Sequence, residues 1–165
     1  MQTATAVLNK RQLKALTKFV DGNANRFRDS RSYRRRMGVN GNRELSRYKY
    51  LKYWSMPNDL RIPLEAQIQA SLWDTANEVY FLHFDKGGFL DTSKFQNDMM
   101  SALMLPLNRQ GRIIIEGTAH KCTPGDGFLF ALNEVHEVPK NIQGAVNYLV
   151  LLYLYGFAQK AVNAT

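Results

Sequence analysis

The sequence is poor in cysteine, and its single thiol excludes several classes of protein. Cys122 cannot form an internal disulfide or supply a zinc-finger ligand set, and one unpaired cysteine suits a reducing compartment better than a secreted scaffold. Long apolar runs are also missing, because no stretch of about 18 uninterrupted apolar residues exists, and the first residues lack the apolar core of a signal peptide. We therefore expect a soluble, cytoplasmic protein with no membrane partner, or a virion component if a phage encodes it.

Acidic residues are scarce in the first third of the chain. Residues 1–53 hold 14 lysines and arginines against 3 acids, a net charge of +11, whereas residues 54–165 hold 8 against 11, a net −3. Such a one-sided basic segment indicates a polyanionic partner or an acidic surface against which it packs. The composition excludes a disordered protein, because 45% apolar residues with 12% aromatics are enough to fill one core in 165 residues.

Two segments have the apolar spacing of a helix. Asn9 is a candidate N-cap, and apolar residues follow it at helical spacing up to the Asp21-Gly22 turn. After Pro63, apolar residues recur at every fourth position from Leu64 to Ala76. This spacing predicts a second amphipathic helix that needs a sheet or another helix to pack on.

From residue 78 onward the apolar period becomes that of strands. Short apolar or alternating runs are separated by turn signals such as Asp85-Lys86-Gly87 and Pro124-Gly125-Asp126. No crossover helix fits between the runs, so we expect an antiparallel sheet in a sandwich or barrel. We divide the chain into a basic N-terminal helix with an Arg/Tyr-rich extension, residues 1–56, and a helix plus β core, residues 57–165, within one compact unit. The expected strands are Glu78–Phe84, Gly88–Phe95, Met99–Leu107, Arg112–Glu116, Gly127–Leu132 and Ala145–Tyr155.

All three histidines fall in the strand-rich part, and two of them suggest a metal site. In His83-Phe84-Asp85 an imidazole and a carboxylate are two residues apart, so on a strand both project from the same face. With the distal His136 they would complete two histidines and one carboxylate, the facial triad of non-haem Fe(II) oxygenases. His120 has no acidic neighbour at this spacing, and we interpret it as an ordinary polar residue of a strand.

The order of these segments resembles that of a known family. His83-Phe84-Asp85 is followed by a strand ending at Leu107-Asn108, then by Gly111–Glu116, Thr123–Phe130 and His136-Glu137-Val138. This order is similar to the 2-oxoglutarate/Fe(II)-dependent oxygenases, and within them to the prolyl-4-hydroxylase-like branch, in which a P-G-x-G-x-L-F stretch precedes a distal His-x-Val. The resemblance covers residues 78–156. It implies a mainly β fold with flanking helices, the cupin-like antiparallel double-stranded β-helix or jelly roll.

The resemblance also implies site residues. His83, Asp85 and His136 would hold Fe(II), which with 2-oxoglutarate and oxygen would hydroxylate a substrate. In the family an Arg or Lys beyond the distal histidine anchors 2-oxoglutarate, but Val146 stands at the matching position here. Because a carboxylate needs a cationic partner, Lys121 or Arg112 would have to replace that anchor from a neighbouring strand.

A second alignment register competes with the first. Family members often show an aromatic residue, a turn with glycine and an apolar pair before the metal-binding motif, and Phe84–Leu90 fits that lead-in. This register places Ser93-Lys94-Phe95 where the ligands belong, which removes the metal site. Both registers stay open from the sequence.

The basic segment lies outside the resemblance. Its arginines can contact phosphates, and its tyrosines and Trp54 can stack on unpaired bases, although Tyr48, Tyr50 and Trp54 equally fit one face of a strand packed on the core. The Asn40-Gly41 pair predicts a tight turn within it. We predict contact with nucleic acid or an acidic protein surface through residues 26–53. The candidate polyanion-binding residues are Arg28, Arg31, Arg34, Arg35, Arg36, Arg43 and Arg47.

Two functions follow from these observations. The leading hypothesis is an Fe(II)/2-oxoglutarate-dependent hydroxylase acting on a protein or nucleic-acid substrate. The alternative is a catalytically degenerate, cupin-like binding or assembly protein of a phage virion or other nucleoprotein particle, able to form a homo-oligomer. In that alternative the basic N-terminal segment contacts a polyanion or an acidic partner. A metal-binding cupin with different chemistry is a third class that no residue pattern selects.

Overall fold

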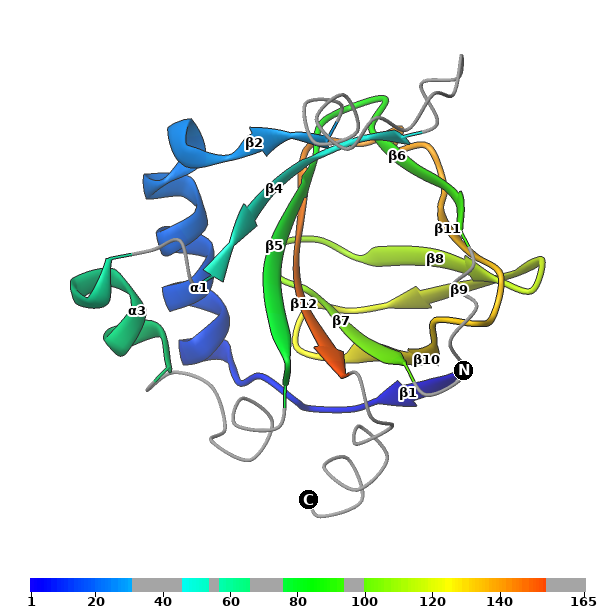
Figure 1. The fold of residues 1–165 in the computed structure, drawn as a ribbon, viewed down its shortest axis with the longest axis horizontal. Helices are drawn as coiled ribbons and strands as arrows, with labels where there is room; N and C mark the ends of the chain where they lie inside the picture. The colour runs from blue at the N-terminus through cyan, green and yellow to red at the C-terminus, as the bar shows by residue number, and fades with distance from the viewer. Residues whose placement is uncertain (31–45, 54–56, 66–75, 94–99, 154–165) are drawn as a thin grey trace.

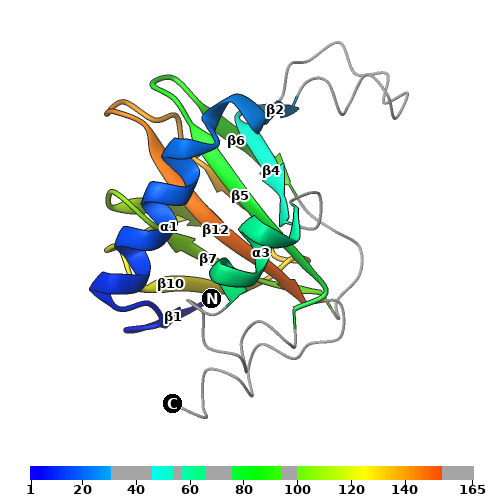
Figure 2. The ribbon, with the colours of Figure 1, turned by 90° about the vertical axis from the view of Figure 1, so that its left-hand side faces the viewer.

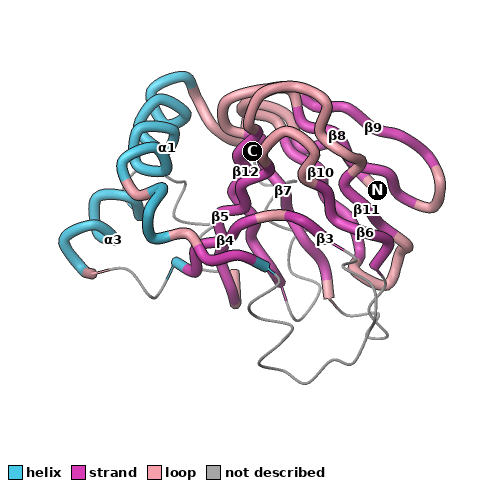
Figure 3. Tube along the Cα trace, turned by 90° about the horizontal axis from the view of Figure 1, so that it is seen from above, coloured by secondary structure: helices cyan, strands magenta, loops and turns pink. Residues whose placement is uncertain are grey.

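Two antiparallel β-sheets face each other in the computed structural model of the chain (Figure 1). The structure describes residues 1–30, 46–53, 57–65, 76–93 and 100–153. Both helices lie on the side of the larger sheet, away from the strands of the smaller one (Figure 3). The predicted fold class, mainly β with flanking helices in a cupin-like jelly roll, is confirmed.

The larger sheet has seven strands and the smaller has five. The seven-stranded sheet runs in the order β1 (Gln2–Ala4), β10 (Gly127–Ala131), β7 (Ser101–Pro106), β12 (Val146–Tyr153), β5 (Glu78–Phe84), β4 (Lys49–Lys52) and β2 (Arg28–Asp29). The five-stranded sheet runs in the order β3 (Ser46–Arg47), β6 (Phe89–Ser93), β11 (His136–Val138), β8 (Gly111–Ile115) and β9 (Thr118–Cys122).

Helix α1 (Lys10–Gly22) covers the outer face of the seven-stranded sheet (Figure 2). Its N-cap is Asn9 and its last residue is Gly22, as predicted. The Asn9 side chain accepts a hydrogen bond from the Gln12 N–H at 2.9 Å, and the Gln12 side chain accepts one from the Asn9 N–H at 2.8 Å, which makes a capping box. Leu16 and Val20 are buried against the sheet, so the helix is held by its apolar face.

Two shorter helical elements complete the described chain. A 3₁₀ turn, η1 (Ala24–Arg26), follows α1, and helix α3 (Asn58–Glu65) lies on the same side of the molecule. The predicted helix over Leu64–Ala76 overlaps α3 only at its first two residues, and residues 66–75 lie outside the described part of the chain. None of the helices within the described ranges is long and apolar enough to cross a membrane.

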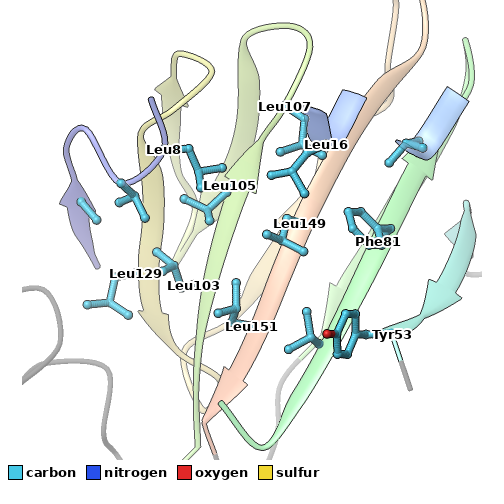
Figure 4. Close-up of a cluster of buried hydrophobic side chains, with 14 of the residues drawn as sticks. Leu8, Leu16, Tyr53, Phe81, Leu103, Leu105, Leu107, Leu129, Leu149 and Leu151 are labelled. Carbon is cyan, nitrogen blue, oxygen red and sulfur yellow. The ribbon is translucent and has the colours of Figure 1, made fainter. Parts of the chain in front are cut away.

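The larger sheet separates two apolar layers. Phe81 and Leu149 point outward to Leu16 of α1, in a cluster that also includes Leu103 and Leu105 (Figure 4). The residues that alternate with them on β5 and β12, such as Phe84 and Tyr148, point into the space between the sheets. A central strand with both faces covered is thus apolar on both faces.

Six observed strands are missing from the expected strands, namely β1, β2, β3, β4, β9 and β11. The strands β1, β9 and β11 illustrate why. β1 and β11 have only three residues each, and β9 reads Thr-Ala-His-Lys-Cys, with no apolar alternation to mark it. All three are identified by their backbone pairing, β1 with β10, β11 with β6 and β8, and β9 with β8. Pairing is a tertiary property, so local sequence pattern misses such strands.

Candidate functional site

His83 and Asp85 lie together at the end of β5. The Nε2 of His83 lies 2.9 Å from Oδ1 of Asp85, and its Nδ1 lies 2.6 Å from Oδ1 of Asn147 on β12. Lys49 contributes an ion pair to the other carboxylate oxygen, at 3.2 Å. The hydrogen bond from His83, followed by that from Lys49, holds the pKa of Asp85 below its ordinary value although partial burial opposes the shift. The predicted same-face placement of this His-x-Asp pair is confirmed.

His83 faces the helix side of the seven-stranded sheet. It alternates with Phe84, which is buried in the interior between the sheets, and it shares its face with Val79 and Phe81 of the outer cluster. The ring of Phe27, just after η1, lies edge-on to the imidazole at 6.1 Å. His83 is therefore outside the barrel.

His136 lies inside the barrel, on β11 of the other sheet. Only 4% of its surface is exposed, and its ring lies 5.2 Å from that of Phe130, which belongs to the interior cluster. The carbonyl oxygen of Glu134 lies 2.8 Å from Nδ1, so this nitrogen donates a hydrogen bond to it.

The structure does not bring the three predicted iron ligands together. His83 and Asp85 are on the outer face of one sheet, whereas His136 faces the interior from the other, and ligands of one first-row metal must all lie about 2 Å from it. Across the described ranges there is no group of three or more His, Cys, Asp and Glu residues that could hold a metal ion. The set His83, Asp85 and His136 does not fit an Fe(II) centre. His83 shares the face of β5 that points away from the barrel interior, whereas His136 points into it.

Strand pairing distinguishes the two alignment registers. β11 pairs with β6, and Ser93 lies opposite His136. The strand beside the distal histidine is thus the one that follows the Gly87-Gly88 turn, as in the second register. That register has no histidine or carboxylate in Ser93-Lys94-Phe95, of which Lys94 and Phe95 lie outside the described residues.

Apolar side chains fill the space between the sheets. Phe128, Ile113 and Tyr148 are at most 2% exposed. A cavity of about 30 Å³ remains beside Tyr148 and Val146. It has room for one or two water molecules, whereas small-molecule sites typically have roughly 300–1,000 Å³. The buried members of the interior cluster are Phe84, Ala102, Met104, Ile113, Ile115, Cys122, Phe128, Phe130, Leu132, Val138, Val146, Tyr148 and Val150.

The two predicted 2-oxoglutarate anchors lie on the smaller sheet, and Arg112 also lines the small cavity beside Tyr148. Arg112 and Lys121 are cross-strand partners on β8 and β9, and both are exposed. They alternate with Ile113 and Cys122, which point inward, so the two cations project from the outer face of the smaller sheet. Their side chains on this outer face give no support to the expectation that Lys121 or Arg112 anchors 2-oxoglutarate, which stays a prediction.

Cys122 shows no feature of a nucleophile. It is buried, and burial raises the pKa of its thiol to about 12, with the Asp126 charge adding to the shift. The thiolate is therefore scarce at neutral pH, as expected from the absence of a neighbouring base.

Only part of the predicted polyanion-binding set lies in the described chain. Arg28 on β2 and Arg47 on β3 are exposed. Arg31, Arg34, Arg35, Arg36 and Arg43 lie outside the described residues. Of the aromatic residues in the segment, Tyr48 packs its ring 5.6 Å from that of Phe84, on the interior cluster, which supports the core alternative for that residue.

Four cations of α1 are absent from the predicted polyanion-binding set, although the N-terminal helix was predicted to be basic. Lys10, Arg11, Lys14 and Lys18 are exposed on the helix, while the predicted basic segment began at residue 26. Their signal in the sequence is the recurrence of lysine at every fourth residue, at positions 10, 14 and 18.

Comparison with known proteins supports the fold. No protein-family model matches the chain, and no curated protein matches its sequence. A Pseudomonas putida prolyl-4-hydroxylase matches in structure with a TM-score of 0.60 and 15% identity, over 92% of this chain and 91% of that one. The fold is a cupin-like double-stranded β-helix. At this level of identity the likeness concerns the fold alone.

Two further solved structures match over less of the chain. A cupin 2 conserved barrel domain protein from Rhodopseudomonas palustris has a TM-score of 0.48 and 12% identity, over 68% of this chain and 66% of that one. A predicted oxalate decarboxylase from Thermotoga maritima has a TM-score of 0.46 and 12% identity, over 66% of this chain and 81% of that one.

Proposed function

We propose that this chain is a binding protein on a cupin-like scaffold, which uses its basic N-terminal segment to contact nucleic acid. The observation that carries the proposal is the position of the predicted ligands. His83 and Asp85 lie on the helix side of the larger sheet, and His136 lies in the interior. The apolar filling of the interior supports the same conclusion, because Phe128, Ile113 and Tyr148 are at most 2% exposed there.

Charge supports the choice of partner. Residues 1–53 have a net charge of +11, and Arg28 and Arg47, which border the undescribed residues 31–45, are exposed. Arginine contacts phosphates through several N–H donors, and such contacts act without regard to sequence. The basic segment is dense in positive charge. A nucleic acid, which presents a regular array of phosphates, therefore matches it better than a protein surface with scattered carboxylates.

Salt-dependent binding tests this function. Fluorescence anisotropy of a labelled 20-nucleotide single strand with the full chain is measured between about 50 and 200 mM KCl, where each phosphate contact contributes roughly −0.7 to the slope of log K against log salt. A variant with Arg31, Arg34, Arg35, Arg36 and Arg43 changed to Gln is expected to bind weakly and with a slope shallower by about 3. The matched control changes five other cations to Gln, namely Lys86, Arg109, Arg112, Lys121 and Lys140.

Either of two results would overturn the proposal. One is the absence of binding by the wild-type chain at about 50 mM salt, and the other is an affinity that does not change with salt. Equal losses in the five-arginine variant and its control would also contradict it, because net charge rather than the segment would then explain the binding.

A second candidate is an Fe(II)/2-oxoglutarate-dependent hydroxylase. The structural likeness to a prolyl-4-hydroxylase and the placement of His136 inside the barrel favour it. It requires a ligand set that includes His136 without His83 and Asp85. Anaerobic equilibrium dialysis tests it, since stoichiometric Fe(II) binding that is lost in His136→Ala but kept in His83→Ala would establish this candidate. The binding-protein proposal expects no stoichiometric Fe(II) in any of the three proteins.

A further inference from the structure

The solvent-facing side of α1 is a continuous stripe of positive charge. Lys10, Arg11, Lys14 and Lys18 are all exposed, and we call them the α1 basic stripe. At about 100° per residue they fall within roughly 100° of the helix circumference, on the side opposite Leu16, which is fully buried.

Helix stability does not explain the stripe. The first turn of α1 contains no acid, and Asp21 at the far end is the one acidic residue of the helix. Positive charges near a helix N-terminus oppose the macrodipole, and the like charges at Lys10, Lys14 and Lys18 repel at a spacing of four residues. Among the described residues, no ion pair involves the stripe. The four cations therefore reduce the stability of the isolated chain, and an external anion would relieve this repulsion.

The geometry of the stripe fits a phosphate backbone. Its lysines follow one another about 6 Å apart and span about 12 Å along the axis. A nucleic-acid strand carries one charge per roughly 3.4 Å, so the stripe faces about three or four phosphates. Each lysine is a mobile point charge that tolerates any base sequence.

Two other kinds of anionic surface fit less well. A helix that binds a membrane inserts its apolar face into the lipid, but the apolar face of α1 is already covered by the sheet, with Leu16 and Val20 buried. A protein partner needs an apolar centre in the interface, and the exposed large hydrophobic residues of the described chain, Ile62 and Ile142, are not on α1.

The stripe is continuous in sequence with the basic segment of the proposed function. α1 leads through η1 to β2, where Arg28 is exposed, and Figure 2 shows β2 beside the end of the helix. We infer that the α1 basic stripe is a second phosphate-binding surface, which holds the nucleic-acid backbone along the solvent-facing side of α1. This inference rests on the proposed function and adds a surface that lies outside residues 26–53.

The test compares two variants of the full chain with equal changes in net charge. The stripe variant combines Lys10→Gln, Lys14→Gln and Lys18→Gln, and the control combines Lys86→Gln, Arg109→Gln and Lys121→Gln, all at exposed positions away from α1. Binding of the labelled single strand is measured over the same salt range. We expect the stripe variant to bind at least about tenfold more weakly at 100 mM salt, with a slope shallower by about 2, while the control changes the slope by less than about 0.5.

The outcomes separate this inference from the proposed function. If the wild-type chain binds and the stripe variant matches the control, the stripe inference is overturned while the proposed function stands. If the wild-type chain does not bind the oligonucleotide, both fail. Binding of the wild-type chain to vesicles with phosphatidylserine, lost in the stripe variant without any loss of oligonucleotide binding, would also overturn the inference. Circular dichroism melting of each variant verifies that α1 is intact.

Discussion

The imidazole of His83 is hydrogen-bonded to the carboxylate of Asp85 at 2.9 Å, on the face of the larger sheet that α1 covers. This pair is what the sequence motif predicts, but it lies on the opposite side of the sheet from His136. Lys49 and Asn147 complete its polar contacts. The arrangement is that of a polar cluster which ties β4, β5 and β12 together at one end of the sheet.

We expect this cluster to make stability depend on pH. The folded pKa of Asp85 is below the ordinary value of 3.8, because the ionised form is hydrogen-bonded to His83 and paired with Lys49. A depressed folded pKa contributes stability that is fully present above pH 3.8 and is lost as the pH falls toward the folded value. Asp85→Asn should therefore destabilise the protein at pH 7 by less than about 1 kcal/mol, since 57% of the Asp85 side chain is exposed.

Urea denaturation at pH 7, 5 and 3 measures this effect. The difference between wild type and Asp85→Asn should be constant from pH 7 to 5 and smaller at pH 3. His83→Gln serves as the matched variant, and in it the NMR titration of the Asp85 carboxylate should shift upward. A wild-type protein no more stable than Asp85→Asn at pH 7 would show that the cluster contributes nothing.

The packed interior leads to a second prediction. Phe128 is fully buried between the sheets, so Phe128→Ala should cost about 3–5 kcal/mol in the free energy of unfolding. The control, Ile142→Ala, removes a side chain that is 69% exposed and should change stability by less than about 0.5 kcal/mol. Chemical denaturation distinguishes this packed core from an open ligand site, in which the two substitutions would have similar small effects.

The sequence predicts the strands better than it predicts which face of each strand is inside. In β5, Val79 and Phe81 point to α1 while Leu82 and Phe84 point to the interior, so both faces are apolar. The period-2 pattern that normally separates core from solvent is therefore absent, and nothing local assigns His83 to the outer face. Its partner Asp85 was predictable, because their same-face placement depends only on strand geometry.

The cap of α1 and the turn at Gly87-Gly88 were predictable for a similar reason, since each depends on neighbouring residues. The pairing of β6 with β11 depends on contacts 43 residues apart in the chain, between Ser93 and His136. Only this long-range pairing distinguishes the two registers of the motif. Short polar strands such as β9 require the same kind of information.

Gly88, in the turn between β5 and β6, should be required for the observed placement of β6. A Cβ at Gly88 would lie 2.9 Å from the backbone oxygens of both Arg47 and Asp85, and backbone atoms on two sides leave it no room to move. Gly88→Ala should thus cost about 1–3 kcal/mol. The control is Gly22→Ala at the end of α1, where nothing lies within 4 Å and where alanine should stabilise the helix by up to about 1 kcal/mol. Opposite shifts in the urea midpoint are expected, and a stable Gly88→Ala protein would contradict the close approach of the two strands.

The N-cap of α1 allows a prediction that also tests the electrostatics of the basic stripe. Asn9→Ala removes the acceptor of the Gln12 N–H and should cost about 0.5–2 kcal/mol. Asn9→Asp keeps the acceptor and places a negative charge beside Lys10 and Arg11 at the positive end of the helix dipole, so it should be more stable than wild type by about 0.3–1 kcal/mol. This gain should shrink in about 1 M NaCl, where the Debye length is only about 3 Å. Urea denaturation at low and high salt measures all three proteins. An Asn9→Asp protein less stable than wild type at low salt would contradict the repulsive arrangement of charges that we infer for α1.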